Sequence, residues 1–134
     1  MRRLLSDRRG ASAVEFALVG PALLTFIFLL IEGGRMEWTR HALQEVAFNG
    51  ARCMALGTDA CNSTSAVQTY TRGLGSGRGV SLARATITAE ANQTCNAVTG
   101  MNKVSIDLPY TFASGLLPFG PNALQAVSCF PSVT

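Results

Sequence analysis

The chain has 134 residues, of which 48% are hydrophobic and only 14% are charged, whereas roughly a quarter of the residues in an average soluble domain are charged. This composition excludes an intrinsically disordered chain, which needs high charge and few apolar side chains, and it indicates that part of the apolar surface is meant for lipid. The formal net charge of +3 resides in residues 1–10, which hold four arginines and one aspartate, so a basic nucleic-acid-binding surface is not expected on the rest of the chain.

An uncharged apolar run, residues 16–31, follows the basic N-terminal segment. Together with residues 11–14, and interrupted only by Glu15, it would form a helix about 30 Å long, enough to cross the hydrocarbon core of a membrane. The arginines before it place residues 1–10 in the cytoplasm by the positive-inside rule. A secretory signal is disfavoured because the following IEGGRMEW offers no small-x-small cleavage site. A plain signal anchor stays open, but it leaves the carboxylate of Glu15 inside lipid unexplained.

The string RRGASAVEF places a basic leader that ends at Gly10 ahead of Glu15, Phe16 and the apolar run. This arrangement, over residues 8–31, resembles the class III (type IVb-like) prepilin motif, and in particular the TadE-like pseudopilins of tight-adherence pilus systems. The resemblance implies that a prepilin peptidase cuts after Gly10 on the cytoplasmic face of the membrane. Ala11 would then be the first residue of the mature chain.

Glu15 is the residue whose role this processing would explain. Cleavage exposes an α-amine at Ala11 that is positive at neutral pH, and Glu15 lies four residues further on, on nearly the same helix face. In a staggered stack of parallel helices the amine of one subunit can reach Glu15 of its neighbour, so that each charge neutralises the other within lipid. Glu15 and the adjacent Phe16 are therefore predicted to set the register of assembly. Pro21, in the middle of the span, either lets the helix extend on assembly or gives a static kink.

Small or apolar residues recur every seven positions beyond the span, in two sets: Met36, Leu43 and Gly50, and Thr39, Val46 and Cys53. This recurrence predicts that the helix continues over residues 35–56 with one buried seam, and that Gly57 ends it. Residues 11–56 are thus expected to form one long helix, half in lipid and half docked on a small domain. The glycine pair at 33–34 leaves a bend between the two halves open.

Shorter elements are predicted after the long helix. Ser63 or Thr64 can cap a helix over residues 65–72. The glycine-rich stretch 73–79 is interpreted as a flexible connector, because it lacks the Lys-Ser/Thr of a phosphate-binding loop. Three segments have the composition or the alternation of strands, at residues 81–89, 103–110 and 123–130. The expected fold class is α+β, with the long N-terminal helix docked on the apolar face of a small three-stranded antiparallel sheet.

The four cysteines indicate two disulfides. An even number of cysteines in a small exported domain is typical of a disulfide framework, and the absence of a CxxC pair or of a histidine near a cysteine argues against zinc. Three pairings are possible. The predicted layout favours Cys53–Cys61, which closes locally after the long helix, together with Cys95–Cys129, which clamps one end of the sheet.

The sequence offers no residues that support catalysis. His41 is the single histidine, and with Glu37 and Glu45 four positions away on either side it is interpreted as a salt-linked surface residue rather than a metal ligand. No serine, cysteine or carboxylate has an identifiable base beside it. The chain is therefore not expected to be an enzyme, and neither a metal nor a cofactor is expected.

Three regions follow from these expectations: a cytoplasmic leader peptide (1–10), a transmembrane assembly helix (11–34) and an exported pilin-like domain (35–134). The resemblance implies a minor pilin or pseudopilin of a tight-adherence, type IV-like pilus that serves adhesion or secretion, since the major pilins of such systems are usually much shorter. It implies a place in the bacterial inner membrane, with the N-terminus cytoplasmic, or in an extracellular pilus. The implied partners are the prepilin peptidase, other pilin subunits, the inner-membrane assembly machinery and membrane lipid, without nucleic acid. The alternative is a signal-anchored, exported binding module that never polymerises.

Overall fold

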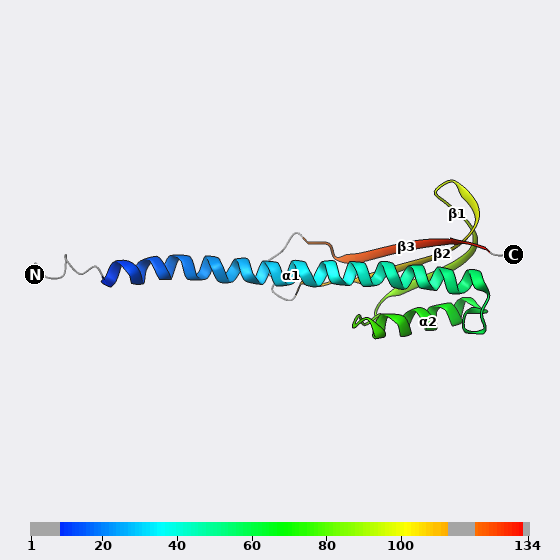
Figure 1. Cartoon of the computed structure of the whole chain (residues 1–134), viewed down its shortest axis with the longest axis horizontal. Helices are drawn as coiled ribbons and strands as arrows, with labels where there is room; N and C mark the ends of the chain where they lie inside the picture. The colour runs from blue at the N-terminus through cyan, green and yellow to red at the C-terminus, as the bar shows by residue number, and fades with distance from the viewer. Residues whose placement is uncertain (1–8, 113–119, 133–134) are drawn as a thin grey trace, which may run out of the picture.

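The computed structural model of the chain describes residues 9–112 and 120–132. Its elements are, in chain order, α1 (Arg9–Leu56), the short 3-10 helix η2 (Asp59–Cys61), α2 (Thr64–Gly77), β1 (Thr86–Cys95), β2 (Val98–Pro109) and β3 (Ala123–Pro131). The fold class is α+β, as predicted, and the first half of α1 projects far beyond the domain that its second half supports (Figure 1). Of the predicted leader, residues 1–8 lie outside the described residues.

The long helix predicted over residues 11–56 is confirmed. α1 is continuous over 48 residues and passes through Pro21 and through the glycine pair at 33–34 without a break, so the bend between its halves is not adopted. Gly57 ends it, because its backbone takes a left-handed φ of 58° that residues other than glycine rarely adopt. The amide of Gly57 donates a hydrogen bond to the carbonyl oxygen of Met54 (3.2 Å).

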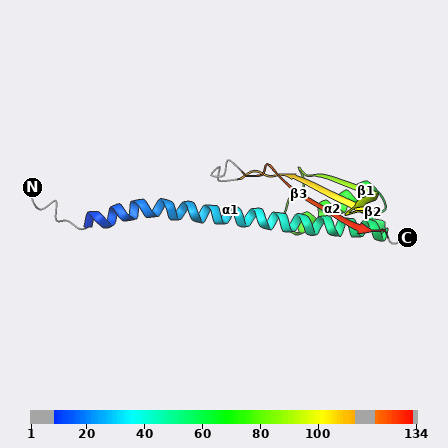
Figure 2. The ribbon, with the colours of Figure 1, turned by 90° about the horizontal axis from the view of Figure 1, so that it is seen from above.

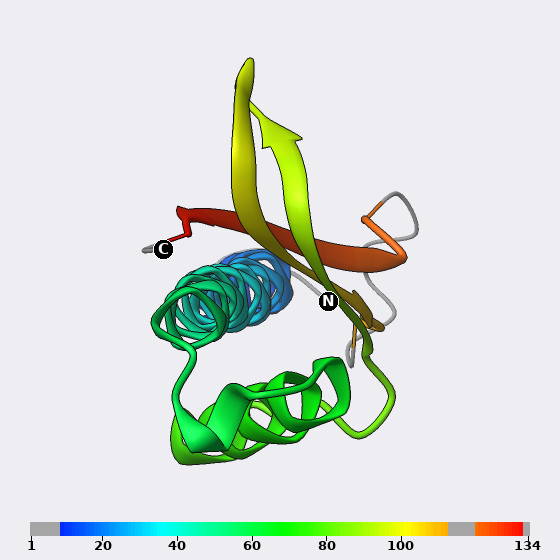
Figure 3. The same cartoon turned by 90° about the vertical axis from the view of Figure 1, so that its right-hand side faces the viewer.

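The three strands form one antiparallel sheet in the order β1-β2-β3. Alternate residues of the central strand face the core: Val104, Ile106 and Leu108 are all buried, which confirms the alternation predicted for this segment. Seen along its axis, α1 lies between the sheet and α2 (Figure 3). The second half of α1 is thus held from two sides.

The buried seam of α1 is where these layers meet. Leu43 is 0% exposed, Val46 is 2% exposed and Gly50 is buried, as the seven-residue recurrence predicts. The side-chain amide of Gln44 donates a hydrogen bond to the carbonyl oxygen of Val127 in β3 (3.1 Å). Fully burying a side chain such as Leu43 or Val46 contributes about 1.5–3 kcal/mol, so this seam accounts for much of the attachment of α1 to the domain.

The glycine-rich stretch is not a flexible connector, which corrects the sequence prediction. α2 continues to Gly77, and Gly75 is buried because the chain folds back closely over it. A Cβ atom at this position would lie 2.6 Å from Cδ1 of Leu82 and 3.0 Å from the carbonyl oxygen of Val80. The guanidinium of Arg72 donates hydrogen bonds to the carbonyl oxygens of Leu82 and Ala85. These bonds hold the segment that follows α2 against the helix.

The first strand also differs from its prediction, since β1 spans 86–95 rather than 81–89. Residues 81–85 form a turn in which the amide of Ala85 donates a hydrogen bond to the carbonyl oxygen of Leu82 (3.1 Å). Both of these side chains are buried, so their apolar character reflects packing of a turn rather than a strand. β2 begins at Val98, before the predicted residue 103, because Asn96 and Ala97 both have positive φ and close a tight two-residue hairpin.

Candidate functional site

The projecting half of α1 is the most unusual surface of the molecule. Its large apolar side chains are exposed, with Phe16 at 78% and Leu18 at 73%, and no residue of its most apolar 18-residue window is buried. The helix is long and apolar enough to cross a membrane by length and composition. Figure 2 shows this half of α1 extending away from the sheet and α2. Such a surface needs lipid or other apolar helices to cover it in water.

The predicted processing site lies at the beginning of this helix. Gly10 belongs to the first turn of α1 and Ala11 follows it, both exposed. A Cβ atom built on Gly10 would meet no atom within 4 Å, so packing within the described part of the chain does not require glycine here. A requirement for glycine at this position would therefore come from a partner that approaches the backbone.

Glu15 and Phe16 are both exposed on α1. Glu15 lies one helical turn after Ala11 and therefore on nearly the same face. Among the residues that the structure describes, Glu15 takes part in none of the ion pairs. The carboxylate thus projects from the apolar part of α1, and no described side chain forms an ion pair with it.

Pro21 does not interrupt the helix, although it removes one backbone N–H donor. The carbonyl oxygen of Pro21 accepts a hydrogen bond from the hydroxyl of Thr25, one turn further along (2.8 Å). The neighbouring Gly20 offers little side-chain packing, since a Cβ there would touch only the ring of Phe16, at 4.0 Å. The helix therefore stays continuous at a position where one backbone hydrogen bond is missing.

The two disulfides join Cys53 to Cys61 and Cys95 to Cys129, the pairing that the predicted layout favours. The first links the end of α1 to η2, across eight positions of sequence. The second joins two strands that are not neighbours, because β2 lies between β1 and β3. The β1–β2 register is irregular at two places between Glu90 and Cys95; such irregularities strengthen the local twist. The Cα atoms of Cys95 and Cys129 lie 6.4 Å apart.

His41 is exposed, and within residues 9–112 and 120–132 it forms none of the ion pairs, which corrects the salt-linked role that the sequence suggested. Glu37 instead pairs with Arg40 (3.2 Å), and Glu45 pairs with Arg78 at the end of α2. Spacing along one helix identified the two carboxylates, but it could not reveal that Arg78 would reach Glu45 from another element.

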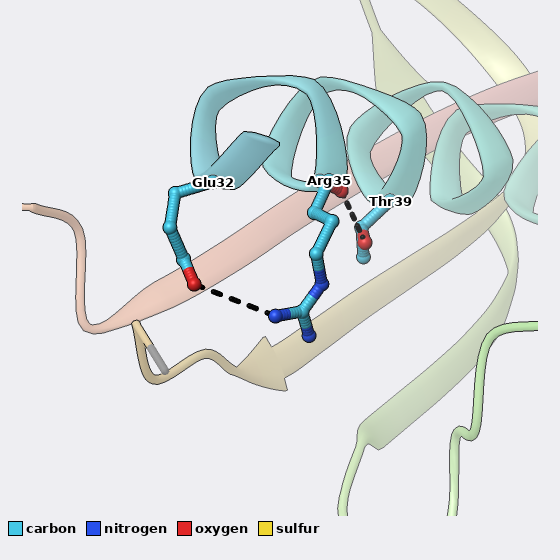
Figure 4. A network of polar contacts seen from close by, with 3 residues as sticks. All are labelled: Glu32, Arg35 and Thr39. Carbon is cyan, nitrogen blue, oxygen red and sulfur yellow. Dashed lines mark hydrogen bonds and ion pairs between the residues drawn. The ribbon is translucent and has the colours of Figure 1, made fainter. Parts of the chain in front are cut away.

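Glu32 is a functional candidate that the sequence reasoning missed. It follows the apolar run directly and is only 5% exposed, with its Oε1 atom 3.5 Å from Nη1 of Arg35 (Figure 4). The hydroxyl of Thr39 donates a hydrogen bond to the carbonyl oxygen of Arg35 (2.9 Å). The missed signal was periodicity, because Glu32 lies seven positions before Thr39 and so extends the buried seam by one repeat.

Comparison with known proteins gives one match. Residues 10–52 match the family model described as TadE-like protein, which confirms over this segment the resemblance carried by the N-terminal motif. The match covers less than half of the chain and ends within α1. It suggests a protein associated with the tight-adherence pilus, from a structural rather than an enzymatic family. No curated protein and no solved structure matches the chain.

Proposed function

Because residues 10–52 of this chain are TadE-like, we propose that it is a minor pilin or pseudopilin of a tight-adherence, type IV-like pilus. It is cleaved after Gly10 and assembles through the projecting half of α1. One observation carries the proposal: this half is apolar on all sides and has no buried residue in its most apolar window. Packing between membrane helices can cover such a surface.

The proposed arrangement in the cell has three parts. Residues 1–10 are a cytoplasmic leader, residues 11–34 cross the inner membrane, and residues 35–134 form a domain on the periplasmic side or in the pilus. The arginines of the leader favour the cytoplasmic side. The two disulfides support an oxidising compartment for the domain. Both features lead to the same orientation independently.

Assembly uses the exposed carboxylate of Glu15. The α-amine that cleavage creates at Ala11 pairs with Glu15 of a neighbouring subunit, and the apolar side chains around them pack without directional preference. This pairing fixes the axial register, because an unpaired charge within lipid is costly. The partners are therefore a prepilin peptidase, other pilin subunits and the inner-membrane assembly machinery. The chain contributes structure to a fibre that serves adhesion or secretion.

The first test is the N-terminus of the membrane-extracted protein, determined by intact mass and N-terminal sequencing. The full chain is produced with and without its cognate prepilin peptidase. We expect a chain that begins at Ala11 only when the peptidase is present. An uncut chain that begins at Met1 in both samples would contradict the proposal and favour a signal-anchored binding module that does not polymerise.

Two glycine variants locate the cut. Gly10→Leu adds a side chain at the proposed cleavage site, and Gly34→Leu adds the same side chain elsewhere on α1. At both positions an added Cβ atom would have no other atom within 4 Å, and leucine is a good helix former, so both variants should fold. We expect Gly10→Leu to remain uncut and Gly34→Leu to be processed like the wild type. Normal cleavage of Gly10→Leu would show that the peptidase does not require glycine at position 10.

A further inference from the structure

A hollow of about 260 Å³ lies where α1 enters the domain. Three segments that are distant in sequence contribute to it: α1, the turn between α2 and β1, and the end of β2. The polar side chains that line it are Arg35, Thr39, Ser81, Arg84, Tyr110 and Thr111. Its volume is several times the ~30 Å³ that one water molecule occupies in the liquid, so a phosphate group fits inside.

The charge of this hollow favours an anion. The described residues that line it include two arginines and no carboxylate. Arg84 makes no ion pair within the described part of the chain. Arg35 is 57% exposed and contacts Glu32 through one nitrogen at 3.5 Å, which leaves most of its five N–H donors available. Figure 4 shows the Arg35 guanidinium extending away from α1 on the same side as the Thr39 hydroxyl.

Tyr110 adds a polar group of a different kind. It lines the hollow, and its hydroxyl is buried without a hydrogen-bond partner among the described residues. Buried hydroxyl groups are nearly always paired, and each exception calls for an explanation. This hydroxyl has less than 1 Å² of accessible surface, so it lies beneath the lining of the hollow, and a bound ligand contacts it only when the lining side chains shift.

The position of the hollow along the α1 axis, relative to the end of the apolar run, indicates the source of its ligand. Arg35 lies four residues after Ile31, the end of the apolar run, and therefore about 6 Å beyond it along the helix axis. The headgroup layer on each side of a bilayer is about 5–8 Å thick. Phe28 lies seven residues before Arg35, two turns deeper on the same face, and it is exposed. A lipid held by its phosphate at Arg35 would run its acyl chains along Phe28.

We propose that this hollow binds the phosphate of an anionic phospholipid headgroup in the leaflet that faces the domain. The guanidinium groups of Arg35 and Arg84 bind the phosphate oxygens, a pairing for which the planar fork of arginine is suited. The surrounding hydroxyl groups bind the remaining polar atoms of the headgroup. The bound lipid fixes the rotation of the domain relative to the membrane surface. This inference rests on the proposed function in one respect, the insertion of α1 into a membrane.

The experiment compares lipids that differ only in the headgroup. The full-length chain in non-ionic detergent is titrated with phosphatidylglycerol, or with phosphatidylcholine of the same acyl chains, and bound lipid is counted by native mass spectrometry. Both lipids carry the phosphate, but the trimethylammonium group of phosphatidylcholine cancels its charge and is repelled by the two arginines, so we expect one phosphatidylglycerol to bind at least about tenfold more tightly than phosphatidylcholine. The double variant Arg35→Gln/Arg84→Gln should lose this preference.

Arg52→Gln is the matched control. Arg52 is exposed on α1 and makes no ion pair among the described residues, but it lies about 25 Å from Arg35 along the helix axis. This control should keep the preference of the wild type. An equal loss in Arg52→Gln, or equal phosphatidylglycerol binding by the wild type and the double variant, overturns the site. If the double variant does not fold, Arg84→Gln alone serves, because no described hydrogen bond or ion pair depends on its side chain.

Two further measurements distinguish the lipid site from a site for a free anion and from a failure of the proposed function. If millimolar inorganic phosphate displaces the lipid from the wild type, the hollow is a site for a free anion and the lipid assignment is wrong. Insertion of the same chain into pure phosphatidylcholine vesicles is scored separately by flotation. A failure to insert there contradicts the proposed function. Normal insertion without headgroup preference contradicts only the lipid site.

Discussion

Gly10 and Gly75 show that the same residue type serves opposite needs in this chain. Gly75 is required by packing, because Leu82 and Val80 occupy the space that a side chain would need. Gly10 has open space around it among the described residues, as Gly34 does, so packing does not require glycine there. The case for Gly10 as the processing site rests instead on its place in the motif ahead of Glu15.

A pair of alanine substitutions in α2 tests the packing explanation. Gly75→Ala should lower the free energy of unfolding by about 1–3 kcal/mol, because the added methyl overpacks a closed contact. Gly73→Ala, in the same helix with no atom within 4 Å, should instead raise it by about 0.5–1 kcal/mol, since alanine favours a helix over glycine. Urea unfolding of the detergent-solubilised chain measures both. Equal midpoints for the two variants would contradict the close contact.

A second residue-scale prediction concerns the charge of Glu15. Glu15→Gln keeps the size of the side chain and removes its charge, so membrane insertion should be retained while assembly fails. We expect the fraction of this chain in sheared pili to fall by at least about tenfold, since a factor of ten corresponds to only ~1.4 kcal/mol. Glu90→Gln, an exposed carboxylate of β1, is the control and should assemble normally. Normal incorporation of Glu15→Gln would refute the register role.

At the scale of elements, a covalent link from β1 to β3 crosses the central strand at the end of the β1–β2 hairpin. β1 has two register irregularities just before Cys95, and the Cα atoms of Cys95 and Cys129 lie 6.4 Å apart. The positive φ of Asn92 falls between the two paired positions where the first irregularity occurs. Local backbone shape and the disulfide therefore support one another, and neither would be expected from a flat three-stranded sheet.

The two disulfides should contribute unequally to stability. In the loop-entropy account, the Cys95–Cys129 link, with a sequence separation of 34, contributes about 3–4 kcal/mol, and the Cys53–Cys61 link, with a separation of 8, about 2–3 kcal/mol. Replacing each pair by serine and comparing urea midpoints measures the difference. A larger loss for the Cys53–Cys61 variant would show that the packing of that pair outweighs loop length.

At the scale of the whole molecule, α1 carries two regions with separate needs. Residues between Met36 and Met54 contribute to the core or pack against it, whereas the most apolar window of the projecting half has no buried residue. A chain that begins at Leu30 should therefore have the same free energy of unfolding in urea as the full chain, within about 0.5 kcal/mol. It retains Glu32 and Arg35 and should no longer need detergent. A clearly lower midpoint would show that the projecting half stabilises the domain.

Sequence reasoning succeeded where the pattern is local or periodic. The apolar run and the seven-residue recurrence together predicted the length of α1, and the recurrence predicted its buried face. The alternation from Val104 to Leu108 predicted the core face of β2. Sequence reasoning failed where contacts between distant segments determine the local structure. The glycine-rich sequence of α2 is typical of a flexible segment, but Leu82 packs directly over Gly75 and holds it in a helix. The start of β1 near Ala85 likewise depends on hydrogen bonds from Arg72.

The hollow beside Arg35 lay beyond sequence reasoning for the same reason. Arg84 and Tyr110 are far from Arg35 along the chain, and only the fold brings the three to one place. The predicted processing motif, by contrast, is contiguous in sequence, so it could be proposed without any structure. What the sequence predicted least well is thus the part of the molecule assembled from several segments.

The unbroken course of α1 has a mechanical consequence. A helix of 48 residues is a rod about 70 Å long. Its C-terminal end is linked through Cys53 to Cys61. Tension applied at the N-terminal end of α1 passes along the helix beneath the sheet, because α1 has no break at residues 33–34 that could act as a hinge. The domain is then loaded in shear along its whole contact with α1, so its attachment must fail over many side chains at once rather than peel open from one edge.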